Sequence, residues 1–155
     1  MRFPSLNTLR KKRFAIGIGF PKAATSYLSA VLGSHPEICF SDRKETHFFE
    51  QHAEEILNTE TPASASSLSR VNFENLWSGF DCHSHQICAE WTVSYISDSK
   101  PLQAIKRFFE TQPEPIFLLA VRDPVSSVLS NYTYMRLIRN DSEAFKKSQL
   151  ECLIQ

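Results

Sequence analysis

Residues 14–26, which read FAIGIGFPKAATS, decide the fold. The apolar half of this stretch, residues 14–18, is followed by Gly19 and Pro21, which is typical of a short buried strand. Apolar residues recur at helical spacing from Tyr27 onward, and a hydroxyl residue just before such a segment is typical of a helix start. The sequence therefore predicts a strand, a tight turn and a helix in direct succession.

The predicted turn carries groups that suit an anion. A turn of this kind points backbone N–H groups and the positive end of the helix dipole outward, which makes a site for a phosphate. Lys22 adds a mobile positive charge, and Thr25 and Ser26 add hydroxyl donors. The alternative is an ordinary strand-to-helix connection with a solvated lysine. Pro21 precedes the lysine where the nucleotide loop G-x-x-x-x-G-K-[ST] has Gly, which disfavours a generic ATPase or GTPase.

Size and charge set the class of protein. The chain has 155 residues and a formal net charge of zero, which indicates one globular domain without a global field that favours nucleic acid or an anionic membrane. No apolar run approaches the ~20 residues that span a bilayer. We interpret residues 1–12 as a flexible lead-in and residues 13–155 as one α/β domain, and we expect a cytoplasmic location. The oligomeric state stays open.

The cysteines predict neither disulfides nor a metal site. The four cysteines show no disulfide-framework spacing. Residues 82–85, Cys-His-Ser-His, and Cys88 resemble a zinc cluster, but they lack the paired C-x-x-C and H-x-x-x-H spacings of structural sites. We interpret them as a loop that leads into a strand over residues 87–93, and we expect no metal.

A second strand, turn and helix follow later in the chain. Residues 116–121, IFLLAV, form the strongest candidate for a buried strand, and a helix is predicted from Val125 to about Arg139. Arg122 lies in the turn between them, where it makes a second anion site plausible. Strands that alternate with helices predict an α/β domain with a mainly parallel sheet, in which ligands bind at the carboxyl ends of strands. Both polar turns lie at such ends.

Residues 44–50, KETHFFE, place two acids and an imidazole beside a phenylalanine pair. One interpretation is an amphipathic segment whose phenylalanines pack while Glu45, His47 and Glu50 face water. The other is a general base held near the phosphate turn. A loop or lid is predicted over residues 58–69.

Four segments, taken in order, resemble the sulfotransferases that use 3′-phosphoadenosine 5′-phosphosulfate (PAPS). GFPKAATSYLSAVLGSHPEI is similar to the 5′-phosphosulfate loop, and FLLAVRDPVSSVLSNY is similar to the 3′-phosphate motif. KETHFFE and EWTVSYI resemble segments of the glycan-modifying (heparan-sulfate-type) branch. The resemblance implies a three-layer, P-loop-like fold with a mainly parallel central sheet. Because the family domain is longer than this chain, it also implies a truncation at the C-terminus.

The resemblance implies a role for each matching residue. Lys22 would meet the oxygen that bridges phosphate and sulfuryl group, while Arg122 and Ser130 would bind the 3′-phosphate. Glu45 would take the proton of the acceptor, with His47 as the other candidate base. The implied nucleotide loop comprises Pro21, Lys22, Ala23, Ala24, Thr25 and Ser26, and the implied acceptor contacts are His47, Glu50, Trp91 and Tyr95.

Three positions depart from the family pattern: Ala24 replaces Gly, Trp91 replaces Lys and Val93 replaces Pro. The resemblance then implies transfer of a sulfuryl group from PAPS to a hydroxyl or amine of a carbohydrate-like acceptor, either a small molecule or a glycan. The alternatives are a non-catalytic nucleotide-binding remnant of the fold and, less well supported, a P-loop kinase.

Overall fold

The computed structural model describes residues 13–64, 73–81 and 83–137. It divides into two compact units, Met1–Ala120 and Val121–Gln155, and each is described by itself. The elements alternate as expected for an α/β chain. In order they are β1 (Arg13–Gly19), α2 (Thr25–Gly33), β2 (Ile38–Phe40), α3 (Phe48–Gln51), α4 (Ala53–Leu57), β3 (Ile87–Trp91), the 3-10 helix η1 (Val93–Ser97), α7 (Ser99–Phe109), β4 (Ile116–Leu119) and α8 (Pro124–Leu137).

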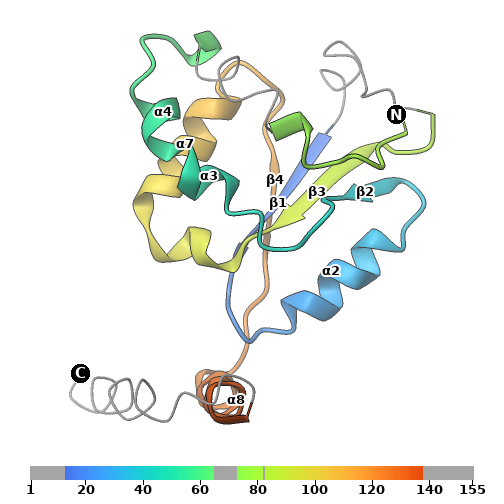
Figure 1. The fold of residues 1–155 in the computed structure, drawn as a ribbon, viewed down its shortest axis with the longest axis vertical. Helices are drawn as coiled ribbons and strands as arrows, with labels where there is room; N and C mark the ends of the chain where they lie inside the picture. The colour runs from blue at the N-terminus through green and yellow to red at the C-terminus, as the bar shows by residue number, and fades with distance from the viewer. Residues whose placement is uncertain (1–12, 65–72, 82, 138–155) are drawn as a thin grey trace. The chain divides into compact units, whose positions relative to one another are not determined.

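The four strands form one parallel sheet in the order β2-β3-β1-β4 (Figure 1). β1 pairs with β3 from Arg13 opposite Ile87 to Gly17 opposite Trp91. The parallel α/β sheet predicted from the sequence is confirmed. Because β1 and β3 are neighbours and run the same way, their carboxyl ends lie at one edge of the sheet.

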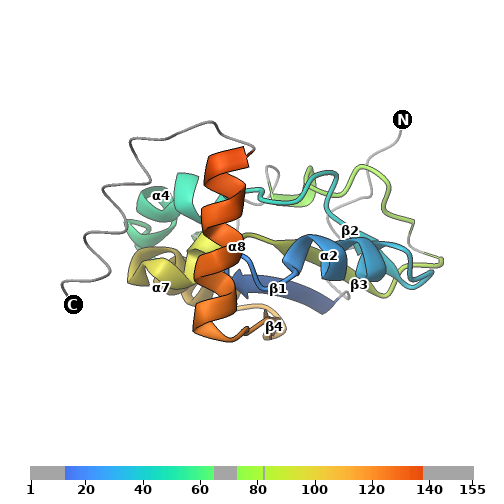
Figure 2. The same cartoon turned by 90° about the horizontal axis from the view of Figure 1, so that it is seen from below.

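The core lies between the sheet and the helices α3, α4 and α7, which gather on one side of it, while α2 lies on the other (Figure 1). Figure 2 shows α2 beside β2 and β3. Alternate residues of β1 point to opposite faces, so Phe14 and Ile16 join this core. Aromatic rings fill much of it: the Phe73 ring lies 4.8 Å from Trp77 and 5.0 Å from Phe48.

Local signals at its first turn and a periodic apolar face explain why Ser99–Phe109 form helix α7. The Asp98 side chain accepts a hydrogen bond from the backbone N–H of Lys100, which caps the first turn. Pro101 lies in that first turn, where its missing N–H leaves no bond unmade. The buried residues recur at helical spacing, namely Pro101, Ala104, Ile105, Phe108 and Phe109.

The predicted strand of residues 116–121 forms, but the prediction that it is buried is wrong. β4 ends at Leu119, and in the described sheet its neighbour is β1 alone. Phe117 and Leu119 therefore expose 47% and 49% of their surface on one face. An apolar run in the sequence indicates that a strand forms. Whether that strand lies at the centre or at the edge of the sheet depends on pairing with distant residues.

Other predictions are met in part. The strand predicted over residues 87–93 ends at Trp91 and passes into η1. Residues 62–64, inside the predicted loop, are helical. The lead-in, Cys82 and Cys152 lie outside the described residues. Within the described part of the chain, no cluster of three metal-ligating side chains is found, and no helix has the length and apolar character needed to cross a bilayer.

Candidate active site

The turn between β1 and α2 forms an open cradle of backbone N–H groups. Lys22 and Ala24 both adopt left-handed backbone conformations, with φ of 62° and 60°. Ala24 is the N-cap of α2 and offers no side-chain acceptor, so no side chain caps the first-turn N–H groups. Such donors at the positive end of a nine-residue helix suit a phosphate.

The side chains of the turn add to the cradle. Lys22 is half-buried, and its burial lowers the pKa of the ammonium from its usual value. Thr25 is buried, and its carbonyl oxygen accepts a hydrogen bond of 2.7 Å from the Ser29 hydroxyl. Ser26 and Pro21 are exposed, whereas Ala23 is buried and fixes the loop to the core. The six residues expected to hold a phosphate therefore form one continuous turn.

Backbone hydrogen bonds join β1, the strand that leads into this turn, to the segment that carries Glu45. The N–H of Thr92 donates to the carbonyl oxygen of Gly17, 3.0 Å away, which continues the pairing of β1 with β3. The N–H of Glu45 donates to the carbonyl oxygen of Trp91, 2.9 Å away. The segment with Glu45 is thus hydrogen-bonded to the end of β3. β3 in turn pairs with β1, the strand that leads into the phosphate turn.

The Glu45 carboxylate has two fixed partners. Its Oε2 accepts a hydrogen bond of 2.9 Å from the N–H of Val93, and its Oε1 forms an ion pair with the Lys44 ammonium. The Glu45 side chain is 29% exposed. Sequence reasoning did not single out Lys44, because a lysine beside an acid is usually a solvated pair. Here Lys44 places a positive charge next to the carboxylate of the candidate base, Glu45.

His47 is oriented by a second acid. Its Nδ1 lies 2.6 Å from Glu50 Oε2, one helical turn further on, and 43% of the His47 side chain is exposed. Because Glu50 bonds to Nδ1, it fixes the plane of the ring. Nε2 is then the ring nitrogen left to interact with a bound substrate. The candidate residues Glu45, His47 and Glu50 thus lie on one short segment, while Phe48 and Phe49 are buried.

Trp91 and Tyr95 occupy positions in the core rather than on a surface. The Trp91 indole N–H donates to the Gly19 carbonyl oxygen, 3.3 Å away. The Tyr95 hydroxyl accepts a hydrogen bond of 3.2 Å from the N–H of Phe49, and burial raises the pKa of this phenol. Both side chains are therefore buried, and these hydrogen bonds go to the backbone of β1 and of the start of α3.

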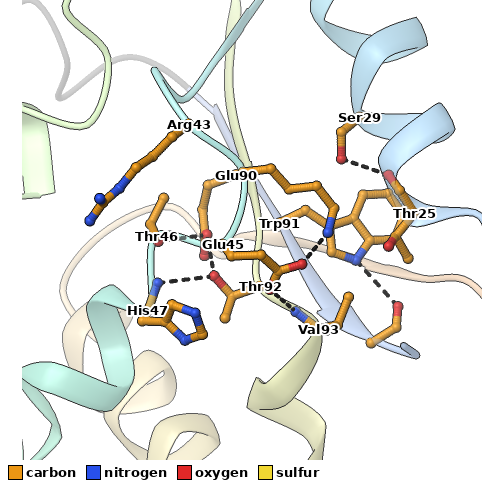
Figure 3. A network of polar contacts seen from close by, with 12 residues as sticks. Thr25, Ser29, Arg43, Glu45, Thr46, His47, Glu90, Trp91, Thr92 and Val93 are labelled. Carbon is orange, nitrogen blue, oxygen red and sulfur yellow. Dashed lines mark hydrogen bonds and ion pairs between the residues drawn. The ribbon is translucent and has the colours of Figure 1, made fainter. Parts of the chain in front are cut away.

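Glu90 is the residue that sequence reasoning missed. It lies on β3 with no exposed surface, and its Oε2 accepts hydrogen bonds from the hydroxyls of Thr46 at 2.9 Å and Thr92 at 3.1 Å (Figure 3). Burial raises the pKa of the Glu90 carboxyl to about 7; hydrogen bonds from Thr46, Thr92 and Tyr95 act against this, and the charge of Glu45 adds to it. In the sequence, Glu90 stands out only as the first residue of the EWTVSYI segment, and nothing there indicates that its carboxyl group is buried.

Arg122 and Ser130 belong to the second unit. Arg122 is exposed and lies just before α8, while Ser130 is half-buried in that helix. Asp123 caps α8, since its Oδ1 accepts a hydrogen bond of 2.8 Å from the N–H of Ser126, which holds the pKa of the Asp123 carboxyl below its usual value. The second unit therefore carries the predicted strand-end arginine followed by a capped helix.

Comparison with known proteins identifies the fold. A family model described as "Sulfotransferase family" matches residues 15–155. The chain belongs to the sulfotransferase family. The match includes the turn between β1 and α2, the KETHFFE segment and the residues around Arg122.

A solved structure supports the fold of this member of the sulfotransferase family. The chain is similar to a sulfotransferase from Alicyclobacillus acidocaldarius, with a TM-score of 0.62 and 21% sequence identity. The similarity covers 88% of this chain and 55% of that chain, so this chain spans about half the length of that protein. Among curated proteins, none matches it. The α/β, P-loop-like fold is confirmed.

Proposed function

We propose that this sulfotransferase transfers the sulfuryl group of PAPS to a hydroxyl or amine of a carbohydrate-like acceptor. The observation that carries the proposal is the uncapped start of α2 behind Lys22, attached through β1 and β3 to the segment with Glu45 and His47. An anion site and a carboxylate base are what sulfuryl transfer requires next to each other. A cytoplasmic location and the reading of residues 13–155 as one domain remain predictions.

In this proposal the turn holds the 5′-phosphosulfate end of the donor. The backbone N–H groups of α2 and the hydroxyls of Thr25 and Ser26 donate to the phosphate, with Pro21, Ala23 and Ala24 shaping the loop. Lys22 reaches the oxygen that bridges phosphorus and sulfur. Arg122 and Ser130 bind the 3′-phosphate, which distinguishes this nucleotide from adenosine 5′-phosphate.

The chemistry needs no other group. The acceptor oxygen or nitrogen forms a bond to sulfur while the bond from sulfur to the bridging oxygen breaks. The acceptor proton passes to Glu45, and the electron pair of the broken bond stays on the phosphate oxygen, where the Lys22 ammonium stabilises it. His47, oriented by Glu50, is placed to hydrogen-bond the acceptor. The ion pair with Lys44 keeps the Glu45 carboxylate in one orientation.

The carbohydrate-like acceptor is proposed from one segment of the sequence. It depends on the resemblance of KETHFFE to the glycan-modifying branch. Trp91 lies where that branch has a lysine, and the indole is buried against β1. Contact with the acceptor therefore falls to His47 and Glu50, whose side chains are partly exposed.

Calorimetry with the product nucleotide, 3′-phosphoadenosine 5′-phosphate (PAP), tests the donor. We expect PAP to bind at least about tenfold more tightly than adenosine 5′-phosphate, because charged hydrogen bonds to the 3′-phosphate are worth this much. Arg122→Ala should remove the difference, whereas Arg136→Ala, within helix α8, should keep it. Equal affinities of the unaltered protein for both nucleotides would contradict the assignment of Arg122 and Ser130.

Transfer of radiolabelled sulfate from PAPS to a panel of hydroxyl- and amine-bearing saccharides tests turnover. We expect Lys22→Ala to abolish transfer, because the lysine stabilises the leaving phosphate, and Lys106→Ala on the exposed face of α7 to leave it unchanged. PAP binding without transfer to any acceptor would favour the alternative of a nucleotide-binding remnant.

A further inference from the structure

Glu90 is a buried acid that the proposed reaction does not use. Its carboxyl group has no exposed surface, and Oε1 has no hydrogen-bond partner among the residues that the structure describes. Burial of a carboxyl group with an unsatisfied oxygen is costly, so an apolar residue of similar size would pack at this position at lower cost. The presence of an acid in the core therefore calls for a reason beyond packing.

The hydrogen bonds of Glu90 lead to the start of α3. Thr46 and Thr92 each use their single hydroxyl proton on Glu90 Oε2. The lone pairs of the same hydroxyls then accept backbone N–H groups: Phe48 N–H donates to Thr46 at 3.3 Å, and His47 N–H donates to Thr92 at 3.2 Å. Because one carboxyl oxygen takes both protons, it sets the direction of both hydroxyls.

The segment held in this way has a strained backbone. Glu45 and His47, on either side of Thr46, have φ of 59° and 54°, in the left-handed region that residues with a Cβ rarely adopt. Such residues persist where the surrounding structure over-determines their conformation. The strained pair is also the pair to which the proposed function assigns the acceptor side of the reaction.

We propose that Glu90 is a positioning residue, which acts through the hydroxyls of Thr46 and Thr92 to hold Glu45 and His47 in their left-handed, acceptor-facing conformation. This inference rests on the proposed function for the roles of Glu45 and His47. A protonated carboxyl keeps one carbonyl oxygen, so Oε2 accepts both hydroxyl protons in either protonation state.

Two variants of Glu90 separate positioning from packing. Glu90→Gln keeps an oxygen that accepts both protons, whereas Glu90→Met keeps the length of the side chain and removes the acceptor. We expect Glu90→Met to lower kcat about tenfold or more, while the PAP dissociation constant is retained and the melting temperature is equal to or higher than that of the unaltered protein. Glu90→Gln should restore kcat to within about threefold of the unaltered protein. If Glu90 acted through packing alone, kcat would be lower in Glu90→Gln than in Glu90→Met, because Met suits an apolar core better than Gln.

Amide hydrogen exchange measured by NMR gives a readout that needs no turnover. Glu90→Met should speed exchange at the N–H groups of both His47 and Phe48 by roughly fivefold, as expected for the loss of one hydrogen bond each. Thr92→Val should speed exchange at His47 alone, and Thr46→Val at Phe48 alone. Thr59→Val, whose hydroxyl bonds to the Ile56 carbonyl at the end of α4, is the matched control and should change neither.

The outcomes distinguish this inference from the proposed function. If Glu90→Met folds and binds PAP while both amides and kcat stay unchanged, the positioning role is wrong even though the transferase assignment stands. If the protein neither binds PAP nor transfers sulfate, the proposed function is wrong. Amide exchange in the threonine variants still tests whether Glu90 holds the segment in that case. It reports on the hydrogen bonds from His47 and Phe48 to the two threonine hydroxyls, and it needs no turnover.

Discussion

The indole N–H of Trp91 donates a hydrogen bond to the carbonyl oxygen of Gly19, 3.3 Å away, so the last residue of β3 is tied to the last residue of β1. The same indole lies over Gly17, where a Cβ atom would come within 2.2 Å of Trp91 Cγ. Gly17 thus makes room for the ring that joins the phosphate turn to the segment with Glu45.

We predict that Gly17→Ala lowers the free energy of unfolding by about 1–3 kcal/mol, because the added methyl group overpacks the contact with Trp91. Urea unfolding measures this change. Gly79→Ala is the matched control, since no atom lies within 4 Å of a Cβ atom built there, and it should alter stability by less than about 0.5 kcal/mol. An equal effect of the two substitutions would mean that the indole moves aside without cost.

Ala24→Gly should stabilise the protein by about 0.5–1 kcal/mol, because glycine adopts the left-handed conformation at φ 60° without the penalty that a Cβ carries. Ala30→Gly, in the middle of the same helix α2, should instead destabilise it by about 1 kcal/mol. Thermal melting of the two variants gives the comparison. Destabilisation of similar size by both would show that the left-handed turn is not strained.

Glu45→Gln should reduce turnover by about 10²–10⁴-fold, the usual contribution of a general base, and leave the PAP dissociation constant within about twofold. Steady-state transfer assays and calorimetry measure the two effects separately. Glu54→Gln, which alters an acid paired with Lys100, serves as the control and should change neither. Unchanged turnover in Glu45→Gln would move the base elsewhere, with His47 as the next candidate.

Glu90 should make stability depend on pH. Its native pKa of about 7 lies above the ordinary 4.5, so the native state holds a proton that the unfolded chain releases between these values. The free energy of unfolding therefore falls as pH rises from about 4.5 to 7, by on the order of 3 kcal/mol in full, and the loss is complete above pH 7.

Urea unfolding of the unaltered protein and of Glu90→Gln at pH 5 and pH 8 checks this prediction. The glutamine variant has no proton to lose at this position, so lowering the pH from 8 to 5 should raise the free energy of unfolding of the unaltered protein relative to that of the variant. A constant difference at both pH values would show that the Glu90 carboxyl titrates normally in the folded protein.

The sequence predicted the parts of the fold that depend on local patterns. An apolar run followed by Gly19 and Pro21 predicted β1, and the apolar run of residues 116–121 predicted β4. Family membership of the chain agrees with the motifs around Lys22 and Arg122. These features could be predicted because each of them depends on neighbours within a few residues.

Long-range contacts explain what could not be predicted. The exposure of Phe117 follows from the position of β4 at one edge of the described sheet, which depends on pairing with β1. The bond between Thr46 and Glu90 joins residues 44 positions apart. An acid on a strand is usually solvated, so nothing local marks Glu90 as buried. Likewise, the burial of Tyr95 depends on its bond to the N–H of Phe49.

The order of strands has a consequence for how the chain acquires its structure during synthesis. β3 lies between β1 and β2, and β4 also pairs with β1, so the first two strands to leave the ribosome have no hydrogen bonds to each other. No ladder between these strands is able to form until Ile87–Trp91 has emerged. Nascent chains that stop short of β3 therefore leave the backbone N–H and C=O groups of β1 and β2 without the partner strand that lies between them in the folded sheet.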